Sequence, residues 1–193
     1  NYSLVVASIE AVSHFLTPLE HFKNNTLKLN AGMKVDLKHL SYKLINMGYE
    51  RVVSVSGEGQ FAIRGGIIDV FSISSGHAAR IELFDDEIDS IRSVDVVSQR
   101  SVDMMESIKI IPARDVIYPE SGKEPVIKKV KMDLAIHTGK IKDKSGNGYI
   151  KCLKENIESD MEKMANDAYF PGMDRYIPYL ADEPSDITDY LGE

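Results

Sequence analysis

The feature that most constrains this chain is a series of short apolar segments joined by very short links between residues 51 and 94. Neighbouring strands with such links must run antiparallel, because a parallel pair needs a crossover of about a dozen residues or more. Gly65-Gly66 suits a two-residue hairpin turn that requires positive φ, and Asp85-Asp86 tolerates the same geometry. The pattern predicts an antiparallel meander whose strands are residues 51–56, 60–64, 67–73, 79–84 and 87–94, with 108–112 as an optional further strand.

An amphipathic helix is expected just before the meander. Asp36 is suited to cap its first turn, and Gly48 to end it. The apolar residues of this segment recur at helical spacing and share one face: Leu37, Leu40, Leu44 and Met47. We expect this face to cover one side of the meander, which gives a compact α+β module over residues 27–114.

The flanking segments have a different pattern. Residues 1–8 resemble a buried strand, and residues 9–22 a helix that is interrupted at Thr17-Pro18. Two helices are expected after the module, followed by an irregular segment rich in aromatic residues and proline; these lie at residues 126–137, 152–164 and 169–179. We therefore divide the chain into three parts, residues 1–26, 27–114 and 115–193. The apolar start and the acidic, base-free stretch at residues 182–193 suggest a piece of a larger protein.

Composition excludes several classes of protein. The chain has 193 residues, of which 43% are hydrophobic and 27% charged, as in ordinary globular domains rather than disordered ones. Its net charge of −7 disfavours a dedicated nucleic-acid binder, which normally has a basic face. No apolar run approaches the roughly 20 residues of a membrane span. The single cysteine, Cys152, favours a reducing cytoplasm, and we expect it to be a small buried residue.

No catalytic or metal-binding motif stands out. Gly122-Lys123 lacks the upstream glycine and the following serine or threonine of a phosphate-binding loop. Gly57-Glu58-Gly59 precedes a strand rather than a helix, so it does not form a dinucleotide site. The acidic run at residues 85–89 is interpreted as a solvated turn rather than a metal site, and the five histidines are scattered. We expect no catalytic residue, no metal and no cofactor.

Strand alternation does indicate one surface of interest. If Ile63 points inward, Ala62 and Arg64 point outward. If Ile81 and Leu83 point inward, the opposite face of that strand carries Arg80, Glu82 and Phe84. Arginine and aromatic side chains are enriched in protein interfaces, but an ordinary solvated face with incidental ion pairs fits the pattern equally well.

Five segments together resemble a known family. They are residues 47–52 (MGYERV), 59–71 (GQFAIRGGIIDVF), 80–92 (RIELFDDEIDSIR), 98–101 (SQRS) and 111–114 (IPAR). In this order they are similar to the homology module shared by the bacterial excision-repair subunit UvrB and the transcription-repair coupling factors, and the resemblance extends over nearly the whole chain. Phe84-Asp85-Asp86-Glu87 and residues 98–101 are closer to the form found in the coupling factors.

The resemblance implies a function. In this family the strand-rich part, called domain 2, binds the damage-recognition ATPase UvrA, and the flanking parts resemble domains 1a and 1b of a helicase-like unit that does not bind nucleotide. The positions that match the UvrA interface are Arg51, Arg64, Arg80 and Glu82, with Phe61 and Phe71 less securely. Ala62 stands where UvrB carries an additional arginine, so one contact of the family is missing.

The implied role is non-catalytic recruitment of UvrA to stalled RNA polymerase. ATP and Mg²⁺, as well as the contacts with RNA polymerase and DNA, would belong to regions outside this chain, and other domains of the full-length protein would be further partners. No membrane partner is expected. Three alternatives remain: a UvrB-type fragment, a DNA-contacting piece of a helicase-like repair protein, and a structural spacer without a partner.

Overall fold

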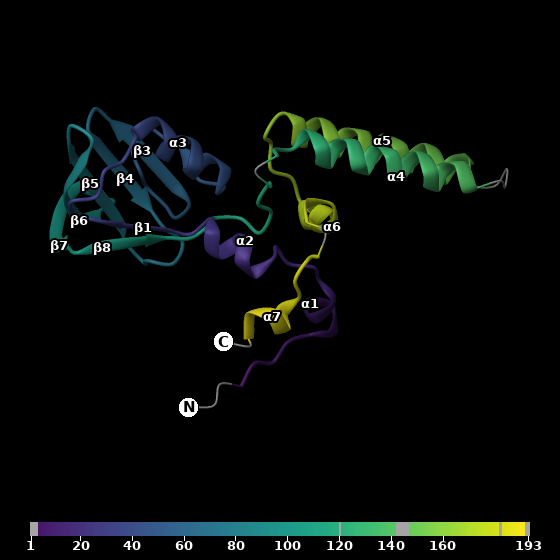
Figure 1. Ribbon diagram of the computed structural model, residues 1–193, viewed down its shortest axis with the longest axis horizontal. Helices are drawn as coiled ribbons and strands as arrows, with labels where there is room; N and C mark the ends of the chain where they lie inside the picture. Colours follow the sequence, from purple (N-terminus) through teal and green to yellow (C-terminus); the bar gives the residue numbers. More distant parts are fainter. Residues whose placement is uncertain (1–3, 120, 142–146, 182, 192–193) are drawn as a thin grey trace. The chain divides into compact units, whose positions relative to one another are not determined.

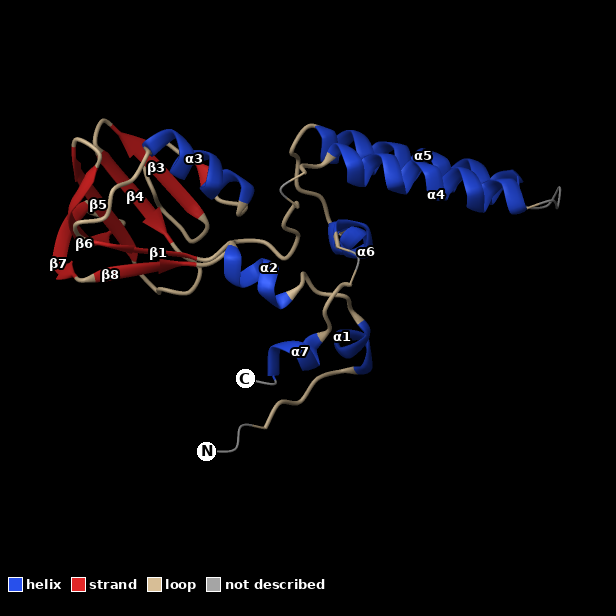
Figure 2. Cartoon of the chain, viewed as in Figure 1, coloured by secondary structure: helices blue, strands red, loops and turns tan. Residues whose placement is uncertain are grey.

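The chain forms two compact units. The computed structural model describes residues 4–119, 121–141, 147–181 and 183–191. Residues Glu20–Ile117 form one unit, called here the sheet unit, and Asn1–Leu19 with Tyr118–Glu193 form the other, called the helical unit. Figure 2 shows strands gathered in the first and helices in the second. The chain is therefore of the α+β class, as the sequence predicts.

A six-stranded sheet dominates the sheet unit (Figure 1). Its strands are β2 (Glu50–Arg51), β3 (Gln60–Arg64), β4 (Ile67–Phe71), β5 (Ala78–Phe84), β6 (Glu87–Asp95) and β7 (Arg100–Met105), paired in that order. All pairs are antiparallel except β2 with β3. The expected hairpins at Gly65-Gly66 and Asp85-Asp86 are confirmed, with positive φ at Gly65 and Asp85.

Helix α3 (Leu37–Asn46) covers one face of this sheet. It begins at Asp36, whose Oδ1 accepts a 2.7 Å hydrogen bond from the His39 backbone N–H. It ends at Met47, followed by Gly48 with φ of +92°. Its apolar side chains pack in the main core, where the largest fully buried residues include Leu44, Met47, Phe61, Ile68, Ile81, Ile88 and Ile91.

A second, two-stranded sheet closes the unit. Strand β1 (Leu27–Asn30) pairs antiparallel with β8 (Ser107–Ile110), and Leu29, Ile108 and Ile110 add to the main core. The optional strand at residues 108–112 is thus present. The sequence analysis missed β1 and β7. In β7 the large apolar residues Val102 and Met104 are exposed, so its pattern is not that of a half-buried strand.

The expected strand at residues 51–56 is largely wrong. Only Glu50–Arg51 pairs as β2; the Val52 backbone N–H still donates a 2.9 Å hydrogen bond to the Phe61 carbonyl, and residues 53–56 then leave the sheet edge. They cross to the face opposite α3, where Val52 and Val55 pack on Ala62, Ala78 and Val94. Val52 and Val55 bury apolar surface there, whereas Val53 is 89% exposed. A run of valines is compatible both with a strand and with such a covering segment, so local composition does not distinguish the two.

The described residues of the helical unit form α1 (Ile9–Ser13), α4 (Glu124–Lys140), α5 (Asn147–Ala165), η2 (Met173–Tyr176), α6 (Ile177–Leu180) and α7 (Ile187–Leu191). Helix α2 (Leu19–Asn24) begins at the last residue of the unit's first segment and otherwise belongs to the sheet unit. The predicted helices at residues 126–137 and 152–164 are confirmed and extend further at both ends. The segment at residues 169–179 contains short helical turns where irregular structure was expected.

Two further expectations about this unit are wrong. Residues 4–8 do not form a strand and are exposed, since no described strand lies beside them; residues 1–3 of the expected strand lie outside the described residues. Cys152 is exposed rather than buried, because it lies on the outer side of α5. Among the helices that the structure describes, none is long and apolar enough to cross a membrane.

The fold predicts a clear contrast between two neighbouring residues of α3. Leu44→Ala should lower the free energy of unfolding by about 2–5 kcal/mol, because Leu44 is fully buried in the core. Ile45→Ala should change it by about 0.5 kcal/mol or less, since Ile45 is 44% exposed. Urea denaturation followed by circular dichroism measures both. Equal effects would contradict the proposed burial of α3.

Candidate functional site

The six-stranded sheet has two different faces. Ile63, Ile81 and Leu83 pack against the main core, as the alternation predicts. The opposite face is divided: part is covered by residues 52–56, and part carries charged side chains, which we call the charged face. Its members come from four adjacent strands and are Arg64, Asp69, Arg80, Glu82 and Arg92.

Asp69 lies at the centre of the charged face. It is only 1% exposed, on β4, and its register neighbours are Ala62 on β3 and Arg80 on β5. Arg80 donates two hydrogen bonds to it, Nε to Oδ1 at 2.7 Å and Nη2 to Oδ2 at 2.9 Å. Arg64 donates through Nη2 to the same Oδ2. One buried carboxylate therefore holds two guanidinium groups, and the three groups together have a net charge of +1.

The two arginines differ in accessibility. The Arg80 side chain is 13% exposed, and hydrogen bonding to Asp69 raises the pKa of its guanidinium above the ordinary value. The Arg64 side chain is 47% exposed and uses one nitrogen on Asp69. Within the described residues, its other two nitrogens have no hydrogen-bond acceptor. Arg64 thus keeps donors for another molecule, whereas Arg80 is mostly held within the sheet.

Gln99 ties the charged face to residues 52–56. Its side-chain amide donates to the carbonyl of Val55 at 2.9 Å and accepts from the Ser54 hydroxyl at 2.7 Å. Its backbone carbonyl in turn accepts a hydrogen bond from Arg80 Nη1 at 3.4 Å. Gln99 has φ of +60°, in the left-handed region. The loop before β7 therefore fixes both the segment that covers the apolar half and the arginine that borders it.

Glu82 and Arg92 continue the pattern of alternating charge. Glu82 Oε2 accepts a 2.8 Å hydrogen bond from the Ser90 hydroxyl and lies 4.0 Å from Arg92 Nε. That nitrogen is shielded from solvent and has no hydrogen-bond partner among the residues that the structure describes. Arg92 is the register partner of Arg80 on the next strand. Sequence reasoning missed Asp69, Gln99 and Arg92; the strand register across from Arg80 would have indicated Asp69 and Arg92.

The structure separates the six residues that the resemblance implies. Arg64, Arg80 and Glu82 lie together on the charged face. Arg51 is exposed on β2 at the edge of the sheet. Phe61 is fully buried in the main core on the other face, so it has no surface to offer a partner.

Three more residues belong to this region of the sheet, and they differ in exposure. Phe71 is half-buried and packs with the small apolar cluster that residues 52–56 cover. Ala62 belongs to the same cluster and is 1% exposed, so a larger side chain there would meet Val55. Phe84, at the end of β5, is 81% exposed and is the large aromatic residue of β5 closest to Glu82.

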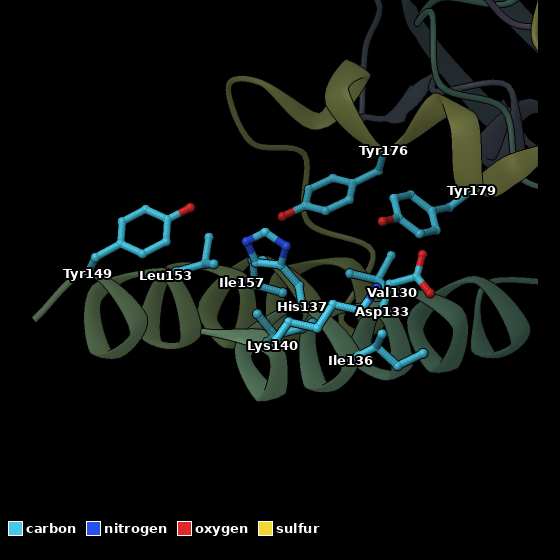
Figure 3. Close-up of a pocket in the computed structure, with 11 residues that line it drawn as sticks. Val130, Asp133, Ile136, His137, Lys140, Tyr149, Leu153, Ile157, Tyr176 and Tyr179 are labelled. Atoms are coloured by element: carbon cyan, nitrogen blue, oxygen red, sulfur yellow. The ribbon is translucent and has the colours of Figure 1, made fainter. Parts of the chain in front are cut away.

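The helical unit contains a groove of about 530 Å³ along one side of α4 and α5 (Figure 3). Tyr176 and Tyr179 form its wall opposite His137. The Tyr176 hydroxyl donates to Asp160 Oδ2 at 2.8 Å, and burial, together with that carboxylate, raises its pKa. Within the described residues, no group of histidine, cysteine, aspartate and glutamate is arranged to hold a metal ion.

Known proteins resemble this chain. Residues 27–116 match the family model described as UvrB interaction domain. The chain is 35% identical over 188 residues to a transcription-repair-coupling factor of Bacillus subtilis (strain 168) and 38% identical over 190 residues to one of Staphylococcus aureus (strain MRSA252). Each comparison covers 97% of this chain and 16% of the relative. The chain thus spans about a sixth of the length of these relatives.

The charged face yields a prediction about stability. Asp69→Ala should lower the free energy of unfolding by about 3–5 kcal/mol, because Arg80 would remain largely buried without its counter-charge. Asp103→Ala removes an exposed carboxylate from β7 and should change it by about 0.5 kcal/mol or less. Chemical denaturation of the two variants tests this. A loss below about 1 kcal/mol for Asp69→Ala would refute the central role of this carboxylate.

Proposed function

We propose that the chain, whose residues 27–116 match the family model described as UvrB interaction domain, is the part of a transcription-repair coupling factor that binds UvrA. The role is that of a non-catalytic adaptor: it brings UvrA to RNA polymerase stalled on damaged DNA. The segments that contact RNA polymerase and that use ATP and Mg²⁺ belong to the remainder of the longer protein. The similarity to coupling factors over 97% of the chain supports this assignment.

The observation that carries the proposal is the shared carboxylate of the charged face. Asp69 fixes the guanidinium groups of Arg64 and Arg80 side by side, and Glu82 adds a negative charge beside them. Arginine is the cation most enriched in protein interfaces, partly because its planar group binds carboxylates with two parallel hydrogen bonds. The face therefore suits a protein partner with an acidic group opposite Arg64 and a basic group opposite Glu82.

Phe84 completes this surface with an apolar side chain. Interfaces usually combine a buried aromatic anchor with charged residues around it. At 81% exposure, Phe84 has nearly its whole ring available for burial by a partner. Arg64, Glu82 and Phe84 are thus the proposed direct contacts; Asp69 positions Arg64, and Arg80 shares that carboxylate.

Binding to UvrA should depend on Arg64. We expect calorimetric titration of the chain with purified UvrA to show binding that Arg64→Ala weakens by about 1–3 kcal/mol. Lys38→Ala is the matched control, because Lys38 is an exposed cation on the helix that covers the opposite face; its affinity should equal that of the unmodified chain. Absence of binding by a folded chain would disprove the proposal, as would an Arg64→Ala variant that binds normally.

The association rate should fall with salt. Raising NaCl from about 50 to 300 mM should slow association about tenfold, while dissociation changes less, because charge attraction acts mainly on the encounter of the two proteins. Surface plasmon resonance with immobilised UvrA measures both rates. A rate constant of association that does not respond to salt would contradict a charged interface.

A further inference from the structure

Positive charge is concentrated in one part of this acidic chain. Residues 123–154 contain nine lysines and three acidic residues, a net charge of +6, so the other 161 residues carry −13. The net charge of −7 is therefore an average of two opposite regions. A basic region in an otherwise acidic chain is a recognised sign of a polyanionic partner.

The structure places this charge on a helical hairpin. Helices α4 and α5 lie side by side and antiparallel, and their linked ends point away from the other elements of the helical unit (Figure 1). The buried residues lie at the opposite end: Val126, Val130, Met161 and Met164. From Lys131 to Asp160, none of the residues whose burial is described is buried. Most of the hairpin is thus accessible from several sides.

Its lysines are available to bind another molecule. Six of them are exposed: Lys128, Lys129, Lys131, Lys140, Lys151 and Lys154. Lys151 has only a loose contact, 3.9 Å, with Glu155. In the described part of the chain, Lys128, Lys131, Lys140 and Lys154 form no ion pair with a carboxylate. By contrast, Lys123 and Lys163 at the base are paired with Asp167 and Asp160.

The type of cation distinguishes this hairpin from the charged face of the sheet. Residues 123–154 contain no arginine. Lysine is depleted in protein–protein interfaces, where arginine is enriched, whereas the phosphate backbone of nucleic acid is contacted by lysine as well as by arginine. Lys128 and Lys131, like Lys151 and Lys154, are spaced three apart and are therefore neighbours on a helix surface. We propose that the α4–α5 hairpin binds the phosphodiester backbone of nucleic acid without sequence preference.

This site is independent of the proposed UvrA-binding face, because it lies in the other unit and uses other residues. Binding through a few lysines is weak, with a dissociation constant on the order of 1–100 µM for non-specific contacts, and it weakens steeply with salt. The acidic remainder of the chain opposes binding. In a longer protein, such a contact would act together with other nucleic-acid contacts rather than alone.

The test measures fluorescence anisotropy of labelled DNA with the 193-residue chain and no UvrA. A 30-base-pair duplex and a single strand of equal length are titrated between about 25 and 150 mM KCl. The triple variant Lys128→Gln, Lys131→Gln and Lys154→Gln keeps helix propensity nearly constant. We expect it to bind at least tenfold more weakly at the lowest salt. Its slope of log affinity against log salt should be shallower by about 2.7 for the duplex and about 2 for the single strand.

The matched control removes three exposed lysines from the sheet unit, through Lys28→Gln, Lys38→Gln and Lys109→Gln. It makes the same change in net charge and should bind within twofold of the unmodified chain. Equal losses in both triple variants would overturn the proposal, as would no binding of either DNA at 100 µM chain and 25 mM KCl. A polyglutamate peptide that displaces DNA at equal charge concentration would also overturn it, in favour of an acidic protein partner.

Discussion

The buried carboxylate of Asp69 is the constraint on which the exposed face of the sheet depends. It lies at the middle of β4, where an unpaired charge would be too costly to bury, and two guanidinium groups from the strands on either side compensate it. This pairing links β3, β4 and β5 by side chains in addition to their backbone ladder. The same pairing keeps positive charge on the part of this face that residues 52–56 leave uncovered.

The two faces of the sheet thus have different roles: one forms the core, and the other carries the charged side chains. The face toward α3 is filled by large aliphatic residues and by Phe61, and it accounts for most of the core. The other face is apolar only where Val52 and Val55 cover it, and Gln99 holds that cover in place through the Val55 carbonyl. Beyond Asp69 the face stays open. A fold stabilised from one side leaves the other side free to carry arginine, glutamate and an exposed phenylalanine.

The sequence was sufficient for those parts of the fold that depend on local pattern. The hairpins, α3 with its cap at Asp36, and the outward direction of Arg64, Arg80 and Glu82 all follow from spacing within a few residues. What it did not reveal depends on distant partners. Residues 53–56 leave the sheet because Ala62, Ala78 and Val94 offer them an apolar surface. The alternation that puts Ile63 inward leaves Phe61 on the same inner face, so strict use of that pattern would have removed it from the expected contacts. Asp69 is an ordinary acidic residue until the register places Arg80 opposite it on β5 and Arg64 diagonally across on β3.

The hydrogen bonds of Asp69 also bear on the entropy of association. A free arginine on a protein surface samples many rotamers, and docking must restrict it at a cost of about 0.5–1.5 kcal/mol. In this chain, Arg80 is already held by two bonds to one carboxylate and Arg64 by one. Much of this loss of rotamer entropy therefore occurs during folding, when the free energy gained by packing the core of the sheet unit compensates its cost. A partner meets a surface whose shape is set in advance, and little of the binding free energy is lost to ordering it.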